Sequence, residues 1–182
     1  MLEFNFHPFP NITTERLILR AIALEDAPEI LALRSDPEAM KYLDRPFTKS
    51  IAEAKEFAQK NIDQLNANDG INWAITLKEN PALIGTIGFW RIDKQHHRAE
   101  IGYMLITAHQ RKGFMQESLA AVLQYGFNTM HLHSIEANVN PANEAAKKIL
   151  LKNNFVQEAY FRENYYYQGS FLDSAIFSLL AP

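Results

Sequence analysis

A short basic segment with one glycine contains the residues best suited to binding an anion. Residues 110–116 read Gln-Arg-Lys-Gly-Phe-Met-Gln, between a run with strand character and a run with helix character. The first N–H groups of a helix have no acceptor within it and lie at the positive end of its dipole. Glycine allows close approach to the backbone, and the basic pair adds charge. The segment therefore predicts a phosphate cradle, although it also suits a plain helix start with a solvated basic face.

Glu100 is the candidate for acid–base chemistry. It is a charged residue within the otherwise apolar run AEIGYMLI, which covers residues 99–106. Partial burial raises the pKa of a carboxyl group toward the range in which it works as a general base. The alternative is a structural role, in which Glu100 pairs with Arg98 or Arg91 at a strand edge.

The residues give little support for a thiol nucleophile, a metal site, a nucleotide-binding motif, or a surface for nucleic acid or membrane. The chain has no cysteine, which excludes disulfides and a thiol nucleophile. His96 and His97 are adjacent and His131 and His133 lie two apart, but neither pair has a third ligand at suitable spacing, so no metal site is expected. Neither the P-loop nor the dinucleotide-binding motif occurs. The net charge of −3 suggests no surface for nucleic acid or membrane.

The length and composition predict one domain that covers residues 1–182. Hydrophobic residues make up 47% of the chain and charged residues 21%, an ordinary balance for a domain with a sizeable core. No linker or repeat divides the chain. The first residues lack the features of a signal peptide, and no apolar run reaches the length of a membrane span. We therefore expect a cytoplasmic protein.

Hydrophobic periodicity and turn residues predict a mixed α/β sheet. The expected order is strand, two helices, three strands, helix, strand, helix and two strands, after an irregular N-terminal arm. Strands are expected over residues 16–22, 72–77, 83–92, 98–106, 134–139, 155–162 and 165–179, the last interrupted near residues 168–169. Helices are expected over residues 25–34, 113–128 and 140–152, the last with Asn140 as its cap, and a short helical piece reaches to Tyr42. A further helix is expected after Thr48 or Ser50 as its cap, with apolar positions from Ile51 to Leu65 on one face, and it ends at the turn of residues 68–70.

Six short motifs, in order along the chain, resemble those of the GNAT N-acetyltransferase superfamily. Gln110-x-x-Gly113-x-Met115 resembles its acetyl-CoA loop, and GFMQESL after it is similar to the version in the ribosomal-protein-alanine N-acetyltransferase-like branch. The other five are TERLILR from residue 14, IGTIG from 84, AEIGY from 99, NPANEAA from 140 followed by KNNF from 152, and DSAIFSLL from 173. Each motif is weak by itself, but their common order covers almost the whole chain.

The resemblance implies a GNAT fold, an α/β architecture with a mixed, mostly antiparallel twisted sheet of about seven strands flanked by helices. It also implies transfer of an acetyl group from acetyl-CoA to a primary amine, by direct attack in a ternary complex. The acceptor is a peptide or protein N-terminus or a small-molecule amine, and the protein is expected as a monomer or a homodimer. No metal, nucleic acid or membrane takes part.

The resemblance also assigns roles to individual residues. Glu100 is the candidate general base, and Asn143 is expected to bind the pantetheine arm or a site water, since Asn140 can supply the helix cap. The N–H of Leu105 or Ile106 is the candidate donor to the thioester oxygen. The thiolate acid stays open between Tyr103 and the tyrosines at 165–167. The residues expected to bind acetyl-CoA are Met104, Leu105, Ile106, Gln110, Arg111, Lys112, Gly113, Phe114, Met115, Gln116 and Asn143.

Three positions depart from the family pattern. Met115 replaces a small residue of the loop, so that its side chain either crowds the pyrophosphate or points into the core. Ala146 stands where many relatives have serine, and Asn154 replaces a glycine. These departures leave two alternatives: a protein of this fold that binds CoA but has lost catalysis, and an interaction protein that binds no CoA.

Overall fold

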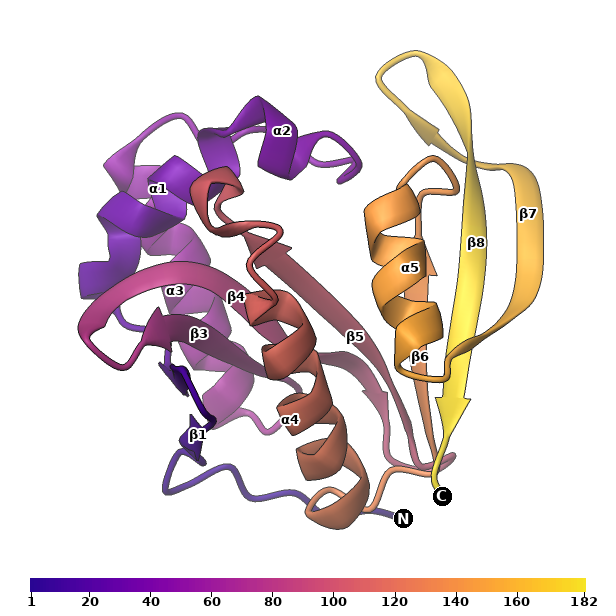
Figure 1. Cartoon of the computed structure of the whole chain (residues 1–182), viewed down its shortest axis with the longest axis horizontal. Helices are drawn as coiled ribbons and strands as arrows, with labels where there is room; N and C mark the ends of the chain where they lie inside the picture. Colours follow the sequence, from indigo (N-terminus) through magenta and orange to yellow (C-terminus); the bar gives the residue numbers. More distant parts are fainter.

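An eight-stranded sheet carries helices on both of its faces in the computed structural model, which describes residues 1–182 (Figure 1). The strands are β1 (Ile12–Thr13), β2 (Leu17–Ala21), β3 (Ile71–Leu77), β4 (Asn80–Asp93), β5 (Arg98–Leu105), β6 (Ser134–Val139), β7 (Val156–Tyr167) and β8 (Ser170–Leu180). The α-helices are α1 (Ala27–Ser35), α2 (Pro37–Met40), α3 (Ile51–Asn66), α4 (Phe114–Asn128) and α5 (Glu144–Lys152), with 3₁₀ turns at Leu24–Asp26 and Thr107–His109.

The strand order confirms the predicted class of mixed sheet. It runs β1-β2-β3-β4-β5-β6-β8-β7, and every neighbouring pair is antiparallel except β5 and β6. The sheet has eight strands rather than about seven, because the N-terminal arm pairs with β2 over the two residues of β1. The parallel pair of β5 and β6 joins two antiparallel groups of strands.

Two apolar clusters fix the helices to the sheet. The larger cluster packs α4 and α5 against one face, through residues such as Leu119, Val122 and Leu150. The smaller cluster packs α1 and α3 against the other face, with Ile30 and Leu33 at its centre. In Figure 1, α4 accordingly lies in front of the sheet and α3 behind it. None of the helices is both long and apolar enough to span a bilayer.

The largest departures from the expected element boundaries lie at the start of α5 and at the turn between β7 and β8. The helix expected from residue 140 begins at Glu144, because Asn140 accepts a hydrogen bond from the Ala142 N–H and so forms a turn before it. The tyrosines at 165–167 belong to β7 rather than to the final strand. Gln168 and Gly169 form the turn between β7 and β8, with φ of 45° and 89°, and two residues with positive φ suit a tight hairpin.

β4 passes very close to β3 at Gly88. A Cβ atom built on Gly88 would lie 2.2 Å from the carbonyl oxygen of Ile71 and 2.6 Å from the Cα of Asn72. Both are backbone atoms, so that a side chain there would force the strands apart. Gly102 lies directly opposite Gly88 on β5, but its nearest neighbour, Trp90 Nε1, would be 3.6 Å from an added Cβ, an ordinary contact.

Gly88→Ala is therefore expected to lower the free energy of unfolding by about 1–3 kcal/mol, the usual cost of an extra methyl group in a packed interior. Gly102→Ala is the matched control, from the opposing position of the same sheet, and should cost much less. Urea denaturation of both variants measures the difference. Equal losses in the two variants would contradict the close approach at Gly88.

Candidate active site

The sheet opens between β5 and β6. These two strands pair only through Arg98 with Ser134, Ala99 with Ile135, and Glu100 with Glu136. Beyond Glu100, β5 continues beside β4 and β6 continues beside β8, and Figure 1 shows the two strands separating toward their C-terminal ends. One edge of β5 is therefore free over its second half.

Hydrogen bonding along β5 decides which main-chain groups face this opening. The Ile106 N–H donates to the Ile84 carbonyl oxygen at 2.9 Å, so that Ile106 faces β4. Because main-chain groups alternate in direction along an antiparallel strand, Met104 also faces β4, whereas Tyr103 and Leu105 face the opening. The expectation that the Ile106 N–H is available to a thioester oxygen is wrong, since that N–H is already bonded. Leu105 remains as the candidate donor.

The loop between β5 and α4 presents a series of unpaired N–H groups. Arg111 and Gly113 both adopt left-handed conformations, with φ of 61° and 82°. No backbone N–H from Arg111 to Gln116 has an acceptor within the chain, and the first helical bond runs from the Glu117 N–H to the Gly113 carbonyl oxygen at 3.0 Å. Left-handed residues alternating with others turn successive N–H groups toward one point, which makes an anion-binding nest. The residues predicted to cradle a phosphate therefore lie in a geometry that suits one.

Several side chains of this segment stabilise the protein itself. Gln110 Nε2 donates to the Leu105 carbonyl oxygen at 3.1 Å and so holds the loop against the end of β5. Gln116 exchanges two hydrogen bonds with Asn153, at 2.9 and 3.0 Å, which join the start of α4 to the end of α5. Met115 packs against the larger core, so that of its two expected positions it takes the inward one. The groups of this loop that stay free for a ligand are therefore mainly its backbone N–H groups.

Glu100 is buried at the point where the two strands part. Its side chain is only 9% exposed, and its Oε2 accepts a hydrogen bond from Arg91 Nη1 at 3.0 Å. Burial raises the pKa of Glu100 above its ordinary value, and Arg91 opposes that rise. Glu136 lies beside it on β6 and raises the same pKa further. The carboxylate therefore has Arg91 as the partner that a structural role predicts, and its pKa is shifted in the direction that suits a general base. The catalytic role of Glu100 stays a prediction.

A β-bulge brings Arg91 to this carboxylate. The pairing of β4 with β5 shifts between Trp90 and Asp93, and Arg91 has a positive φ of 47°. A bulge redirects side chains, and here the guanidinium lies over the Trp90 ring, 4.3 Å from its centre, as well as against Glu100. Beside them, a cavity of about 220 Å³ is lined by Arg91, Asp93, Arg98, Ala99, Glu100 and Glu136.

Asn143 is the cap of α5, a role that the sequence had assigned to Asn140. Its Oδ1 accepts a hydrogen bond from the Ala146 N–H at 3.0 Å, which satisfies one free donor of the first helical turn. The Asn143 side-chain NH₂ has no hydrogen-bond partner in the chain, and this amide is the part of the residue that remains free to bind a ligand.

The structure also brings together residues whose mutual contact the sequence did not indicate. The loop between α2 and α3 reaches across from β4 to β7, where the Tyr165 hydroxyl donates a hydrogen bond to Asp44. The next residue, Arg45, lies over the Trp90 ring, 5.3 Å from its centre. Nothing in the spacing of these residues indicates their contact, because they come from three distant segments. By contrast, the Tyr103 hydroxyl is buried without a partner, and burial raises its pKa.

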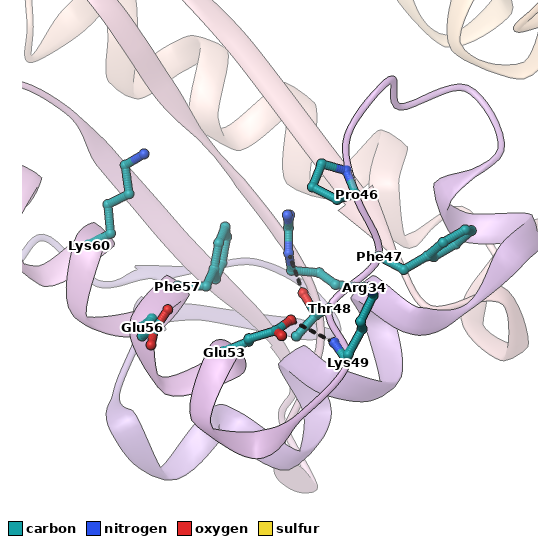
Figure 2. Close-up of a pocket in the computed structure, with 9 residues that line it drawn as sticks. All are labelled: Arg34, Pro46, Phe47, Thr48, Lys49, Glu53, Glu56, Phe57 and Lys60. Atoms are coloured by element: carbon teal, nitrogen blue, oxygen red, sulfur yellow. Dashed lines mark hydrogen bonds between the residues drawn. The ribbon is translucent and has the colours of Figure 1, made fainter. Parts of the chain in front are cut away.

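Another cavity lies elsewhere and contains none of the predicted site residues. It measures about 440 Å³ and lies between the end of α1 and the start of α3 (Figure 2). Arg34 is its central cation: Nε donates to Thr48 Oγ1 at 3.1 Å, and the guanidinium lies over the Phe57 ring. Glu53 and Glu56 share the same wall, so that the lining has mixed charge. No group of three His, Asp or Glu side chains is arranged to hold a metal ion.

Comparison with known proteins places this geometry in a family. Residues 16–156 match the family described as "Acetyltransferase (GNAT) domain". The chain is 38% identical over 174 residues to the uncharacterized N-acetyltransferase YoaA of Bacillus subtilis (strain 168), a match covering 96% of this chain and 98% of YoaA. It is 27% identical over 160 residues to the spermidine N(1)-acetyltransferase of Vibrio cholerae serotype O1, with 87% and 89% covered.

A solved structure has the same fold. RimL, a ribosomal L7/L12 alpha-N-protein acetyltransferase in complex with coenzyme A, matches with a TM-score of 0.86 at 22% identity, over 94% of this chain and 98% of RimL. The family match covers most of the chain, and the YoaA match covers nearly all of it. The family predicted from six motifs is therefore confirmed: the chain belongs to the GNAT acetyltransferase family and is an acetyl-CoA-dependent N-acetyltransferase.

Proposed function

We propose that this enzyme moves the acetyl group of acetyl-CoA directly to a primary amine while both substrates are bound. The observation that carries the proposal is that two features lie together at the opening between β5 and β6. Unpaired N–H groups from Arg111 to Gln116 lie at the end of β5, and the Glu100 carboxylate lies where the strands part. The chain has no cysteine to accept the acetyl group first, which agrees with direct transfer.

Acetyl-CoA fits the chemistry of the opening in two parts. Its pyrophosphate suits the nest, where free N–H groups, the helix dipole and the exposed side chains of Arg111 and Lys112 all favour an anion. Its pantetheine arm suits the free edge of β5, along which an extended chain can bind as an added strand. The Leu105 N–H then lies within reach of the thioester oxygen and stabilises the negative charge that develops on it.

The acceptor amine approaches from the face of the sheet that α1 and α3 cover. Side chains alternate along β5, and since Met104 packs with the α1 and α3 cluster, Glu100 is on that face too. The amine nitrogen forms a bond to the acetyl carbon, the carbon–sulfur bond breaks with its electron pair leaving on sulfur as the CoA thiolate, and Glu100 takes the amine proton directly or through a water. A neutral amine is required for attack, which is why a base with a raised pKa is useful here.

The acceptor is a primary amine of a peptide N-terminus or of a small molecule. The named relatives act on spermidine and on a ribosomal protein, so that the family includes both classes. In this chain the guanidinium groups of Arg45 and Arg91 flank Trp90 beside Glu100. Arg91 is paired with Glu100, and Asp93 and Glu136 line the same cavity, so that the lining beside the proposed base has mixed charge.

The proposed reaction is tested with acetyl-CoA and a set of peptides, small amines and spermidine. Release of CoA in amounts equal to the acetylated amine, as measured by thiol titration and mass spectrometry, is the expected result with at least one of these amines. A rise in melting temperature with CoA but no product from any amine would favour a CoA-binding protein without catalysis. No thermal effect of CoA would contradict the proposed cofactor site.

Glu100→Gln is expected to lower kcat by about 10²- to 10⁴-fold, the usual contribution of a general base. In the unchanged enzyme the rate should rise with pH as Glu100 loses its proton, through a pKa above the ordinary value for glutamate. This acidic limb should disappear in Glu100→Gln. An unchanged rate across the pH range would remove Glu100 from the mechanism.

Substitution of the two charged neighbours of Glu100 tests whether this carboxylate sets the acidic limb, because the two changes should shift its pKa in opposite directions. Arg91 lowers the pKa of Glu100, so that Arg91→Gln should move the acidic limb of the pH–rate profile to higher pH. Glu136 raises that pKa, and Glu136→Gln should move the limb to lower pH. If both variants leave the limb in place, a group other than Glu100 sets it.

Asn143→Asp separates capping from ligand binding. The aspartate keeps a cap oxygen and suits the positive end of the helix dipole, so that stability should be retained. It loses the free amide donor, and the KM for acetyl-CoA should therefore rise several-fold. Thermal denaturation and steady-state kinetics measure the two effects. An unchanged KM would mean that Asn143 acts only as the cap of α5.

A further inference from the structure

Arg16 joins the strand β2 to the loop and helix that form the nest. Its backbone N–H and its Nε donate to the two carboxylate oxygens of Glu117, at 2.8 and 2.7 Å, and Thr14 Oγ1 donates to the same carboxylate at 2.6 Å. Its Nη1 donates to the Lys112 carbonyl oxygen at 2.9 Å, and its guanidinium lies over the Phe114 ring. These contacts involve nothing that reacts, yet they all end on the segment with free N–H groups or on Glu117, the residue directly after it.

We propose that Arg16 is a positioning residue, which fixes the orientation of the backbone N–H groups that receive the pyrophosphate. This inference rests on the proposed acetyl-CoA site and assigns Arg16 no contact with the reacting atoms. The guanidinium acts as a fork, with Nε on a helix residue and Nη1 on a loop carbonyl, so that it sets the position of the loop relative to α4.

The planarity of the peptide bond explains how this works. In a trans peptide unit the C=O of one residue and the N–H of the next point in opposite directions. With the Lys112 carbonyl oxygen held by Arg16, the Gly113 N–H must point away from Arg16, toward the outside of the loop. Rotation of this one peptide unit would turn a carbonyl oxygen toward the ligand and replace an attractive group with a repulsive one.

The surroundings of Gly113 support the same role. A Cβ atom on Gly113 would lie 3.2 Å from Arg16 Nη2, a tight contact that a small shift of the guanidinium relieves, so that the positive φ of 82° is the main reason for glycine here. Glu117 would also place a negative charge near a bound pyrophosphate. Burial raises the pKa of Glu117, but the hydrogen bonds from Thr14 and Arg16 outweigh this effect and lower it overall, so that the charge persists and Arg16 neutralises it.

Arg20, on β2 four residues after Arg16, offers a matched control. Its guanidinium also forks onto a carboxylate, with distances of 2.8 and 2.6 Å to the two oxygens of Asp26, and it also donates to main-chain carbonyl oxygens, those of Ala21 and Pro81. None of these partners belongs to the loop before α4. Loss of either arginine therefore removes a comparable ion pair, but only loss of Arg16 frees the Lys112 peptide unit.

The test compares Arg16→Gln, Arg16→Lys and Arg20→Gln by isothermal titration with CoA. Both Arg16 variants should raise the Kd for CoA about tenfold, since lysine keeps the charge but cannot form the fork. Arg20→Gln should lower the melting temperature and leave the Kd within about twofold of the unchanged protein. Unaltered CoA binding in both Arg16 variants, full retention of affinity in Arg16→Lys, or equal weakening in Arg20→Gln would each overturn the inference.

Kinetics with S-acetylpantetheine, which lacks the pyrophosphate, supply a second readout. The kcat/KM for acetyl-CoA should fall in the Arg16 variants, whereas that for S-acetylpantetheine should stay the same. An equal fall for both donors would indicate general damage and contradict a role in orienting the nest. If the unchanged protein binds no CoA, the proposed function itself fails; if it binds CoA and the variants bind equally well, only the role of Arg16 fails.

Discussion

The end of the pairing between β5 and β6 is the constraint on which the site depends. Three residue pairs, the last being Glu100 with Glu136, are all that join the strands on one side to those on the other. Past this point each strand stays with its own antiparallel partner, so that the free edge of β5 keeps unpaired main-chain groups. Such groups need a partner, and an extended ligand arm can supply it without any change in the fold.

The proposed recognition of acetyl-CoA in this region uses backbone groups, and the side chains hold that backbone in place. Gln110 ties the loop to β5, Gln116 ties α4 to α5, and Arg16 ties the loop to β2. Many kinds of side chain can hold a loop in place, whereas a row of N–H groups suits an anion only when the groups point toward it. This difference explains how a loop whose second small residue is replaced by Met115 keeps an anion-binding shape, because that side chain packs into the core.

The acidic group at the opening is costly to the fold. The folded-state pKa of Glu100 lies above that of an exposed glutamate, so that the group favours the folded state at low pH and loses this contribution as pH rises through the folded-state pKa. The β-bulge at Arg91 reduces the cost by placing a cation against the carboxylate. A charge that is buried and only partly compensated is typical of a group selected for chemistry rather than for stability.

The sequence by itself determined the family, the class of fold, the segment that can receive an anion, and Glu100 as a charge out of place in an apolar strand. These follow from local order along the chain: six motifs, the periodicity of apolar residues, and a glycine before a helix. It misplaced the cap of α5, because Asn140 and Asn143 both suit that position and only the turn at Asn140 separates them.

Only the tertiary structure decided how these parts combine. It showed that Leu105 rather than Ile106 faces the opening, that Arg91 reaches Glu100 through a bulge, and that Arg16 holds a loop almost a hundred residues away. Strand register and side-chain contacts between distant segments arise from packing, which no short stretch of sequence encodes.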